Sequence, residues 1–308
     1  MLAPFEITIL GNNSAIPANG RFPSAQLLNI HDQLLLVDCG EGSQIRLAET
    51  KKKAFRLEHI FITHLHGDHF FGIFGLLTSM SLLGRTKTLN IYCHAPLQKL
   101  LETTLEITKG GINYPIEFHF LPETGSQVIC TTAHFEVTAF QLTHRIPTCG
   151  FLFKERFPKR KINQDKLIEA GIPKVFWGDI QKEKDVLLDT GELVASKDYI
   201  LPGPKPRTYA YCTDTQFTLD FVPVIEGADT IYVDSTYMSS DEQKAKDRYH
   251  CTAAQAATIA KTAGVGRLLL GHFSSKYRNL QPLLDEAKAV FKLTEIAHQG
   301  KTFSIESW

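Results

Sequence analysis

Several features that define special classes of protein are missing from this sequence. The six cysteines form no CxxC pair and no close cluster, and we interpret them as reduced thiols of the core. No stretch approaches the roughly 18 consecutive apolar residues of a membrane span. The N-terminal stretch also lacks the basic start and long apolar run of a secretion signal. These absences predict a cytoplasmic protein that is not embedded in a membrane.

A net charge is missing as well, because 33 Lys and Arg residues balance 33 Asp and Glu residues. If the partner is a nucleic acid, attraction must therefore come from local basic patches and metal charge, since the overall charge supplies none. The sequence also has no internal repeat and no low-complexity tract. What is present is a chain of 308 residues with 43% hydrophobic content, which is ample for one large domain or two ordinary ones.

One short stretch concentrates side chains that bind metals. His64, His66, Asp68 and His69 lie within six residues, directly after the apolar run 60–62, where a buried strand surfaces into a loop. Imidazole and carboxylate groups suit Zn²⁺ or a similar divalent ion, and four such ligands exceed what one ion with an open position can use. The spacing therefore predicts two metal ions side by side.

Apolar runs that alternate with helical patterns indicate a layered α/β protein. The sequence predicts two similar β-rich halves with helices outside. We expect strands at 5–10, 26–30, 33–37, 89–92, 135–142, 209–212, 230–233 and 267–270, and helices at 70–83, 95–106, 252–263 and 282–290.

Two further polar residues at strand ends have alternative interpretations. Asp38 follows the run 33–37 and either accepts a hydrogen bond from a metal-binding histidine or caps the helix that follows. His144 follows the run 135–142, and its position alone leaves a ligand and a structural residue equally open. The other isolated histidines are interpreted as surface or hydrogen-bonded structural residues, namely His31, His59, His94, His119, His134 and His298.

A basic segment begins at Lys154. Six basic residues stand against two acidic ones between 154 and 166, and a Gly/Pro break follows at Gly171-Ile172-Pro173. A basic projection suits the phosphate backbone of a nucleic acid, because Lys and Arg neutralise phosphates and release counterions. The alternative is a solvated surface excursion.

The C-terminal third carries two segments that identify a family. The segment His250-Cys251-Thr252-Ala253-Ala254-Gln255-Ala256-Ala257 resembles H-S-T-A-x-Q-A-A, and His272-Phe273-Ser274-Ser275-Lys276-Tyr277 resembles H-F-S-x-R-Y. The stretch 64–69 has the pattern HxHxDH. Together with it, the two segments resemble the short form of the ribonuclease Z family, within the metallo-β-lactamase superfamily. The resemblance extends from Ile9 to Tyr277. It implies one α/β domain over 1–308, a metallo-β-lactamase-like four-layer αββα sandwich of two mixed sheets, with a protruding flexible arm that binds tRNA at about 154–199.

The resemblance also implies an activity. Members remove the 3′ trailer from precursor tRNA by two-metal phosphodiester hydrolysis and leave a tRNA 3′-hydroxyl and a 5′-phosphate on the trailer. They hold two Zn²⁺ per subunit, with Mn²⁺ or another divalent ion as the alternative, and act as homodimers whose arm grips tRNA for the partner's site.

Individual roles follow from the same resemblance. His64, His66 and His144 would hold one ion; Asp68, His69 and His272 would hold the other, with Asp214 bridging. Asp68 would also orient or deprotonate the attacking water. His250, paired with Asp234, would protonate the leaving oxygen. The RNA contacts would come from Arg21, Lys154, Arg156, Lys159, Arg160, Lys161 and Lys276.

Three segments depart from the family pattern. Val233-Asp234-Ser235-Thr236 stands for H-E-A-T, so an aspartate replaces the glutamate beside His250. The loop 17–22 keeps only Pro17 and Arg21 of P-x-K-x-R-N, which in relatives senses an encoded CCA. The Gly-Pro expected after Pro173 is replaced around 175–178.

Two other functions are compatible with a metal site of this kind. The same fold hosts hydrolases of many substrates, so the chain could act on a small phosphodiester or ester. A metal-bearing RNA-binding protein without turnover is the third hypothesis. The basic segment disfavours the former, and the full ligand set disfavours the latter.

Overall fold

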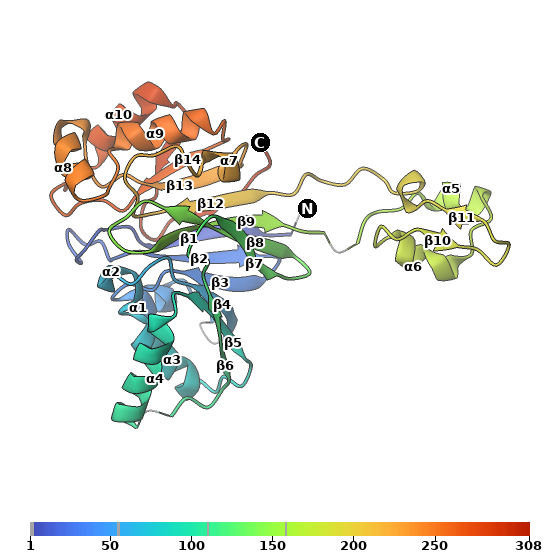
Figure 1. The fold of residues 1–308 in the computed structure, drawn as a ribbon, viewed down its shortest axis with the longest axis horizontal. Helices are drawn as coiled ribbons and strands as arrows, with labels where there is room; N and C mark the ends of the chain where they lie inside the picture. Colours follow the sequence, from blue (N-terminus) through green and yellow to red (C-terminus); the bar gives the residue numbers. More distant parts are fainter. Residues whose placement is uncertain (1–2, 54–55, 110, 158) are drawn as a thin grey trace.

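The computed structural model describes residues 3–53, 56–109, 111–157 and 159–308. Within these ranges, two seven-stranded sheets stack face to face and helices cover the outer face of each (Figure 1). The predicted αββα sandwich is therefore confirmed. All six cysteines are free and buried, as the interpretation of core thiols requires.

The first sheet combines antiparallel strands on one side with parallel strands on the other. Strands β16, β1, β2 and β3 pair antiparallel, and β3 to β6 pair in parallel. In spatial order the strands are β16 (Thr302–Ser304), β1 (Phe5–Gly11), β2 (Ala25–Ile30), β3 (Gln33–Val37), β4 (Leu57–Phe61), β5 (Leu89–Cys93) and β6 (Ile116–Phe120).

The second sheet is also mixed. Strands β15 to β12 are parallel, whereas β12, β9, β8 and β7 pair antiparallel. In spatial order the strands are β15 (Thr294–Ile296), β14 (Leu268–Gly271), β13 (Thr230–Asp234), β12 (Thr208–Cys212), β9 (Thr148–Glu155), β8 (Phe135–Leu142) and β7 (Ser126–Thr131).

Three hydrophobic clusters correspond to the three interfaces between layers. In β3, Leu35 and Val37 pack between the sheets, whereas Leu34 and Leu36 pack beneath helices. Successive side chains of a strand point to opposite faces, so a strand covered on both faces reads as a continuous apolar run. The helices on the first sheet are α1 (Ser43–Glu49), α2 (Gly67–Phe70), α3 (Ile73–Leu82) and α4 (Pro96–Thr108); those on the second are α7 (Val222–Ile225), α8 (Glu242–Asp247), α9 (Ala253–Thr262) and α10 (Gln281–Val290).

Helix α9 illustrates how the sequence sets a boundary. Thr252 Oγ1 accepts a hydrogen bond from Gln255 N (3.2 Å), and Gln255 Oε1 accepts one from Thr252 N (3.0 Å). This reciprocal pair satisfies two backbone donors that the first turn would otherwise leave free. Small buried side chains, Ala256 and Ala260 among them, then let the helix lie close on the sheet. The cap fixes where the chain leaves His250 and enters the helix.

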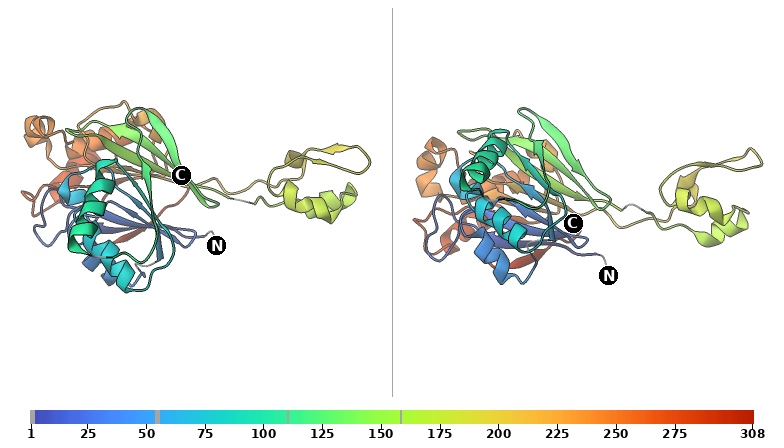
Figure 2. Two further views of the ribbon diagram at one scale, coloured as in Figure 1. Left: turned by 60° about the horizontal axis from the view of Figure 1, so that its bottom comes forward. Right: turned by 90° about the horizontal axis from the view of Figure 1, so that it is seen from below.

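The segment between β9 and β12 projects away from the sandwich (Figures 1 and 2). It contains α5 (Gln164–Glu169), α6 (Trp177–Ile180) and the small hairpin β10 (Val186–Leu187) and β11 (Leu193–Val194). We call this segment the arm. It has an apolar cluster of its own, formed by Ile162, Leu167, Ile172, Ile180, Val186 and Val194. The arm therefore has a folded tip, which two connecting segments of the chain join to the sandwich. No helix among the described residues has the length and apolarity that crossing a membrane requires.

Candidate active site and metal centre

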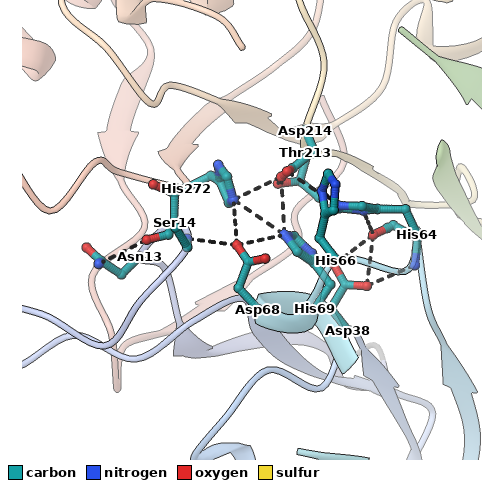
Figure 3. Close-up of polar contacts among 12 residues, drawn as sticks. Asn13, Ser14, Asp38, His64, His66, Asp68, His69, Thr213, Asp214 and His272 are labelled. Carbon is teal, nitrogen blue, oxygen red and sulfur yellow. Dashed lines mark hydrogen bonds and ion pairs between the residues drawn. The ribbon is translucent and has the colours of Figure 1, made fainter. Parts of the chain in front are cut away.

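The seven side chains expected to bind metal follow strands of both sheets and lie close to one another. Figure 3 shows six of them, namely His64, His66, Asp68, His69, Asp214 and His272. His64 and His66 follow β4, Asp68 and His69 lie on α2, and the remaining three follow strands of the second sheet. Parallel strands bring their carboxyl ends to a common edge, which is where sites on such scaffolds are built. Those three are His144 after β8, Asp214 after β12 and His272 after β14.

Unusual backbone conformations occur at this edge. Asp38, Asp214 and His272 have φ angles of 55°, 55° and 59°. The left-handed region is costly for residues with a side chain, and such strain gathers at functional sites where the surrounding structure enforces it. Here each residue turns the chain sharply at the end of a buried strand.

Three histidines form the first group of expected metal ligands. His66 Nδ1 lies 3.0 Å from His64 Nε2 and 3.2 Å from His144 Nε2. Asp214 Oδ2 lies 3.5 Å from His64 Nε2 and 3.6 Å from His144 Nε2. The geometry thus joins His144, whose role its position alone left open, to the two histidines of the central motif.

The second group lies on the other side of Asp214. His272 Nε2 is 2.9 Å from Asp214 Oδ1 and 3.4 Å from His69 Nε2. Asp68 Oδ2 lies 3.5 Å from His69 Nε2 and 3.7 Å from His272 Nε2. Asp214 therefore presents one oxygen to each group, which is the arrangement of a bridging ligand.

The outer nitrogens of the histidines are held by hydrogen bonds. His69 Nδ1 donates to Asp38 Oδ2 (2.7 Å), and His144 Nδ1 donates to the Tyr249 carbonyl (3.1 Å). Because these oxygens can only accept, the proton lies on Nδ1 of both rings. The opposite nitrogen, Nε2, then faces the centre of the site.

Two threonines serve the remaining rings in the same way. Thr63 Oγ1 donates to Asp38 and can therefore accept from His64 Nδ1 (3.0 Å). Thr236 Oγ1 donates to Asp234 (2.6 Å) and can accept from His272 Nδ1 (3.0 Å). Such outer partners fix the tautomer and orientation of metal-binding histidines. In both rings Nε2 again faces inward.

Asp38 has a defined place in this network. It accepts from His69 Nδ1, from Thr63 N (2.9 Å) and from the Tyr211 hydroxyl (3.0 Å), and it is fully buried. Helix α1 begins after Gly42 without a side-chain cap. The interpretation of Asp38 as the acceptor behind a metal-site histidine agrees with this geometry, and the helix-capping alternative is wrong.

The residues present fit divalent cations. Burial lowers the pKa values of His64 and His144 to about 4, so both rings are neutral at pH 7 and offer lone pairs. At His272, burial lowers the pKa, but Asp214 and Asp68 outweigh burial and raise it to about 10. The carboxylates of Asp214 and Asp68 thus favour positive charge at the centre of the site, either as protons on histidine or as metal ions. A mixed nitrogen and carboxylate donor set is the one that Zn²⁺ and similar ions prefer.

A separate pair of residues lies beside the two groups. His250 Nδ1 is 2.7 Å from Asp234 Oδ2, and the other oxygen of Asp234 accepts from Thr236 N (3.0 Å) and Oγ1. Although Asp234 is one methylene shorter than the glutamate of the family pattern, it reaches the histidine. Asp234 fixes His250 through Nδ1, which leaves Nε2 as the ring's second site for a proton.

Both groups and His250 open onto a cavity of about 560 Å³. The cavity is also lined by two residues that the sequence patterns did not single out, Arg145, which follows His144, and Arg248, which is two residues before His250. Their proximity to ligand positions was the available signal. The Ala15 backbone N–H donates to Asp68 Oδ2 (2.8 Å), which anchors the loop on the facing wall. The lining includes Ser14, Ile16, Pro17, Glu41, His66, Asp68, Asp214, Thr236, His272, Ser274 and Ser275.

The residues expected to contact RNA are in two kinds of environment. Near the site, Arg21 donates to Asn13 Oδ1 and the Tyr277 carbonyl (both 2.9 Å), and Lys276 Nζ lies 2.7 Å from Asp241 Oδ2. Both side chains therefore hold local structure together. On and beside the arm, Arg156 donates to the Thr132 carbonyl and Arg160 pairs with Glu183, whereas Lys154, Lys159 and Lys161 are exposed.

The two stacked sheets and the cluster at their edge define a protein of the metallo-β-lactamase fold. The metallo-β-lactamase fold protein YhfI of Bacillus subtilis superposes with a TM-score of 0.69 at 21% identity, over 98% of this chain and 99% of that chain. A family model described as the anti-Pycsar protein Apyc1 matches residues 5–161.

Full-length relatives then specify the family. Proteins named Ribonuclease Z from Phocaeicola vulgatus and Bacteroides fragilis are each 40% identical, over 98% of this chain and over 98% and 99% of their own lengths. The crystal structure of human tRNase Z, short form, has a TM-score of 0.70 at 26% identity and covers 98% of this chain and 99% of that chain. The chain belongs to the ribonuclease Z family.

Proposed function

We propose that this protein is a metal-dependent endoribonuclease that removes the 3′ trailer from precursor tRNA. The observation that carries the proposal is a complete ligand cluster with an adjacent His250–Asp234 pair in a chain similar to ribonuclease Z along its whole length. The reaction is hydrolysis of one phosphodiester, which leaves a 3′-hydroxyl on the tRNA and a 5′-phosphate on the trailer. Because precursor tRNA is its substrate, we assign the protein to the cytoplasm.

Two divalent ions, which we propose to be Zn²⁺, would be held by the two groups of ligands. His64, His66 and His144 would hold one, Asp68, His69 and His272 the other, and Asp214 both. When bound, the ions supply Lewis-acid chemistry, which stabilises charge on the phosphate and lowers the pKa of the attacking water.

Asp68 acts on that water. Burial raises the pKa of its carboxyl, but His69 and His272 outweigh burial and hold it well below the usual range, so the group stays ionised and can only accept hydrogen bonds. With Oδ2 fixed by Ala15 N, the carboxylate is positioned to accept a hydrogen bond from the water and align it for attack.

His250 acts on the opposite side of the phosphorus. As the bond from phosphorus to the 3′ oxygen breaks, that oxygen gains negative charge and needs a proton. Asp234 stabilises the protonated imidazole through Nδ1, so Nε2 can deliver the proton to the leaving oxygen. The buried Asp234 thereby acts through His250 and needs no contact with RNA.

The arm extends far enough from the sandwich to contact the body of the tRNA. The arm projects away from the sandwich (Figure 2), and its exposed lysines, Lys159 and Lys161, can neutralise phosphates of the tRNA. We further propose that the chain works as a homodimer in which the arm of one subunit holds tRNA for the other.

The decisive experiment uses precursor tRNAs with and without an encoded CCA, incubated with the zinc-loaded protein, and maps the ends of both products. Cleavage at one position just beyond the last base pair of the acceptor stem, with a 3′-hydroxyl on the unpaired nucleotide that the tRNA retains, supports the proposal. Comparison of the two substrates tests the altered loop 17–22. Turnover of a small phosphodiester without cleavage of any precursor tRNA would contradict it and favour a small-molecule hydrolase.

A further inference from the structure

A second cavity lies next to His250. It has a volume of about 570 Å³, and His250 lines both this cavity and the catalytic one. The remaining lining consists of an aromatic ring, three glutamine side chains and one residue of each charge, namely Phe217, Gln216, Gln243, Gln255, Glu242 and Lys246. We call it the Phe217 cavity. The mechanism described above makes no use of it.

We propose that the Phe217 cavity binds the base of the last nucleotide that the tRNA retains. This inference rests on the proposed function. The leaving 3′ oxygen belongs to that nucleotide and receives its proton from His250, so the attached ribose and base start at His250 and extend away from the metal ligands. The Phe217 cavity meets the catalytic cavity at this residue, because His250 lines both.

The chemistry of the walls suits a nucleobase. Phe217 is 39% exposed, which for a large apolar ring in a concave wall offers a face for stacking. Gln243 Nε2 donates to Asp247 (2.8 Å), so its carbonyl oxygen is left to accept from a base edge. Glu242 and Lys246 balance each other in charge, and such a wall suits a neutral planar group better than an anion.

The walls are also fixed relative to the catalytic residues. Gln216 N donates to the Thr143 carbonyl (2.9 Å), and Cys251 Sγ lies 3.1 Å from the Thr215 carbonyl. Gln255 is held in the cap of α9 and donates to Glu242 (2.9 Å). The loop carrying Phe217 is therefore tied to the chain beside His144 and His250. A base seated there would set which phosphodiester meets the catalytic groups.

The test compares two substrates and four proteins. The substrates are a precursor tRNA with its natural last retained nucleotide and the same RNA with an abasic residue at that position. The proteins are the full-length zinc-loaded wild type, Phe217→Ala, Phe217→Tyr and Leu219→Ala. Leu219 lies on the same loop and is 42% exposed, but it does not line the cavity, so it is the matched control.

Stacking of one base is worth roughly 1–3 kcal/mol, so we expect kcat/KM to fall by about 5- to 150-fold when either the base or the ring is removed. The two losses should not add, because each removes the same contact. Phe217→Tyr should retain the wild-type rate on the natural substrate, and Leu219→Ala should retain it too. Hydrolysis of bis(p-nitrophenyl) phosphate should be unchanged in all three variants.

Two results would overturn the inference while the proposed function stands. One is an abasic penalty in Phe217→Ala that equals the penalty in the wild type. The other is an equal loss on bis(p-nitrophenyl) phosphate, which would assign Phe217 to the support of the catalytic residues. If the wild type cuts no precursor tRNA at all, the proposed function itself fails and the inference fails with it.

Discussion

The catalytic edge and the arm are built on opposite principles. At the catalytic edge, every histidine of the metal groups except His66 has its outer nitrogen held by a hydrogen bond, and His64, His69 and Asp38 are fully buried. The arm instead projects on two strands of chain, with a small apolar cluster and exposed lysines (Figure 2). The fixed side chains of the catalytic edge suit chemistry, and the projection of the arm suits the proposed capture of precursor tRNA. Substitutions in the two regions should affect different kinetic constants.

The largest effect is expected at the catalytic edge. Asp68→Ala would remove both a proposed metal ligand and the proposed acceptor for the attacking water, so cleavage of precursor tRNA and of bis(p-nitrophenyl) phosphate should both fall by on the order of 10⁴-fold. Binding of precursor tRNA, measured by gel shift, should survive because the arm is intact. An active variant would refute the role of Asp68.

Replacement of His250 separates proton donation from the rest of the chemistry. His250→Ala should lower kcat on precursor tRNA by about 10²- to 10³-fold, because a ribose oxygen is a poor leaving group without a proton. Hydrolysis of bis(p-nitrophenyl) phosphate should be nearly unchanged, since nitrophenolate leaves without protonation. His298→Ala, which removes an exposed histidine outside the cavity, is the control. Equal losses on both substrates would place His250 in metal binding.

Removal of the arm should give the converse pattern. Lys154 and Thr208 are paired across β9 and β12, so a short Gly-Ser turn can replace residues 159–203 without separating the strands. We expect kcat/KM on precursor tRNA to fall by on the order of 100-fold, mainly through KM, because contacts to phosphates are lost. The small diester should be cleaved at the wild-type rate. A loss in kcat alone would contradict a role in substrate capture.

The contrast between the two regions also decided what the sequence could predict. The proposed ligands at the catalytic edge follow strands, but only His64 and its neighbours form a local cluster in the sequence. Asp214 and His272 are single residues, and their assignment came from the family resemblance. Asp38 was ambiguous because its role depends on β3 lying beside β4 in parallel register, with Val37 opposite Phe61, which brings Asp38 next to Thr63. Pairing of strands that are distant in sequence is not encoded by any local pattern.

Other features depended on the same kind of long-range proximity. Lys276 matches a family motif, but nothing in its neighbourhood in sequence indicated that it would pair with Asp241. Phe217 sits in a polar loop without periodicity, so no local pattern indicated its place next to His250. The clearest case is the root of the arm, by which we mean the contact between Glu155 and Arg207 where the arm leaves the sandwich. These two residues are separated in the sequence by the entire arm.

That root is the one part of the arm built like the catalytic edge. Glu155 is 1% exposed and accepts hydrogen bonds from Arg207 Nε (2.9 Å) and N (3.1 Å), and His31 Nε2 lies 2.6 Å from its other oxygen. Arg207 also donates to the carbonyls of Ala3 (2.7 Å) and Ile305 (3.3 Å). The Glu155–Arg207 pair therefore links the two segments that connect the arm to the sandwich. It also links them to Ala3 and Ile305, near the two ends of the chain.

Breaking this root should affect stability more than cleavage. Glu155→Gln leaves the Arg207 charge buried without its partner, which we expect to cost on the order of 3 kcal/mol in the free energy of unfolding. KM for precursor tRNA should rise by roughly 3- to 10-fold as the arm loses its orientation, a change of about 1 kcal/mol. Glu183→Gln removes an exposed partner of Arg160 and should cost less than about 1 kcal/mol.

The smallest expected effect is on the free energy of unfolding when the pH is lowered. Burial raises the pKa of Glu155, but Arg207 and His31 outweigh burial and lower it below the ordinary value. A carboxyl whose pKa is lower in the folded state than in the unfolded state contributes stability above the unfolded value, about 4.3, and loses that contribution as the pH falls through the folded value. The wild type should therefore exceed Glu155→Gln in stability at pH 5, where the Glu155 carboxyl is largely ionised in both the folded and the unfolded chain. In urea unfolding the margin should shrink as the pH falls from 5 to below about 4. A margin that grew over this range would show that the ionised carboxylate of Glu155 is not what stabilises the contact with Arg207.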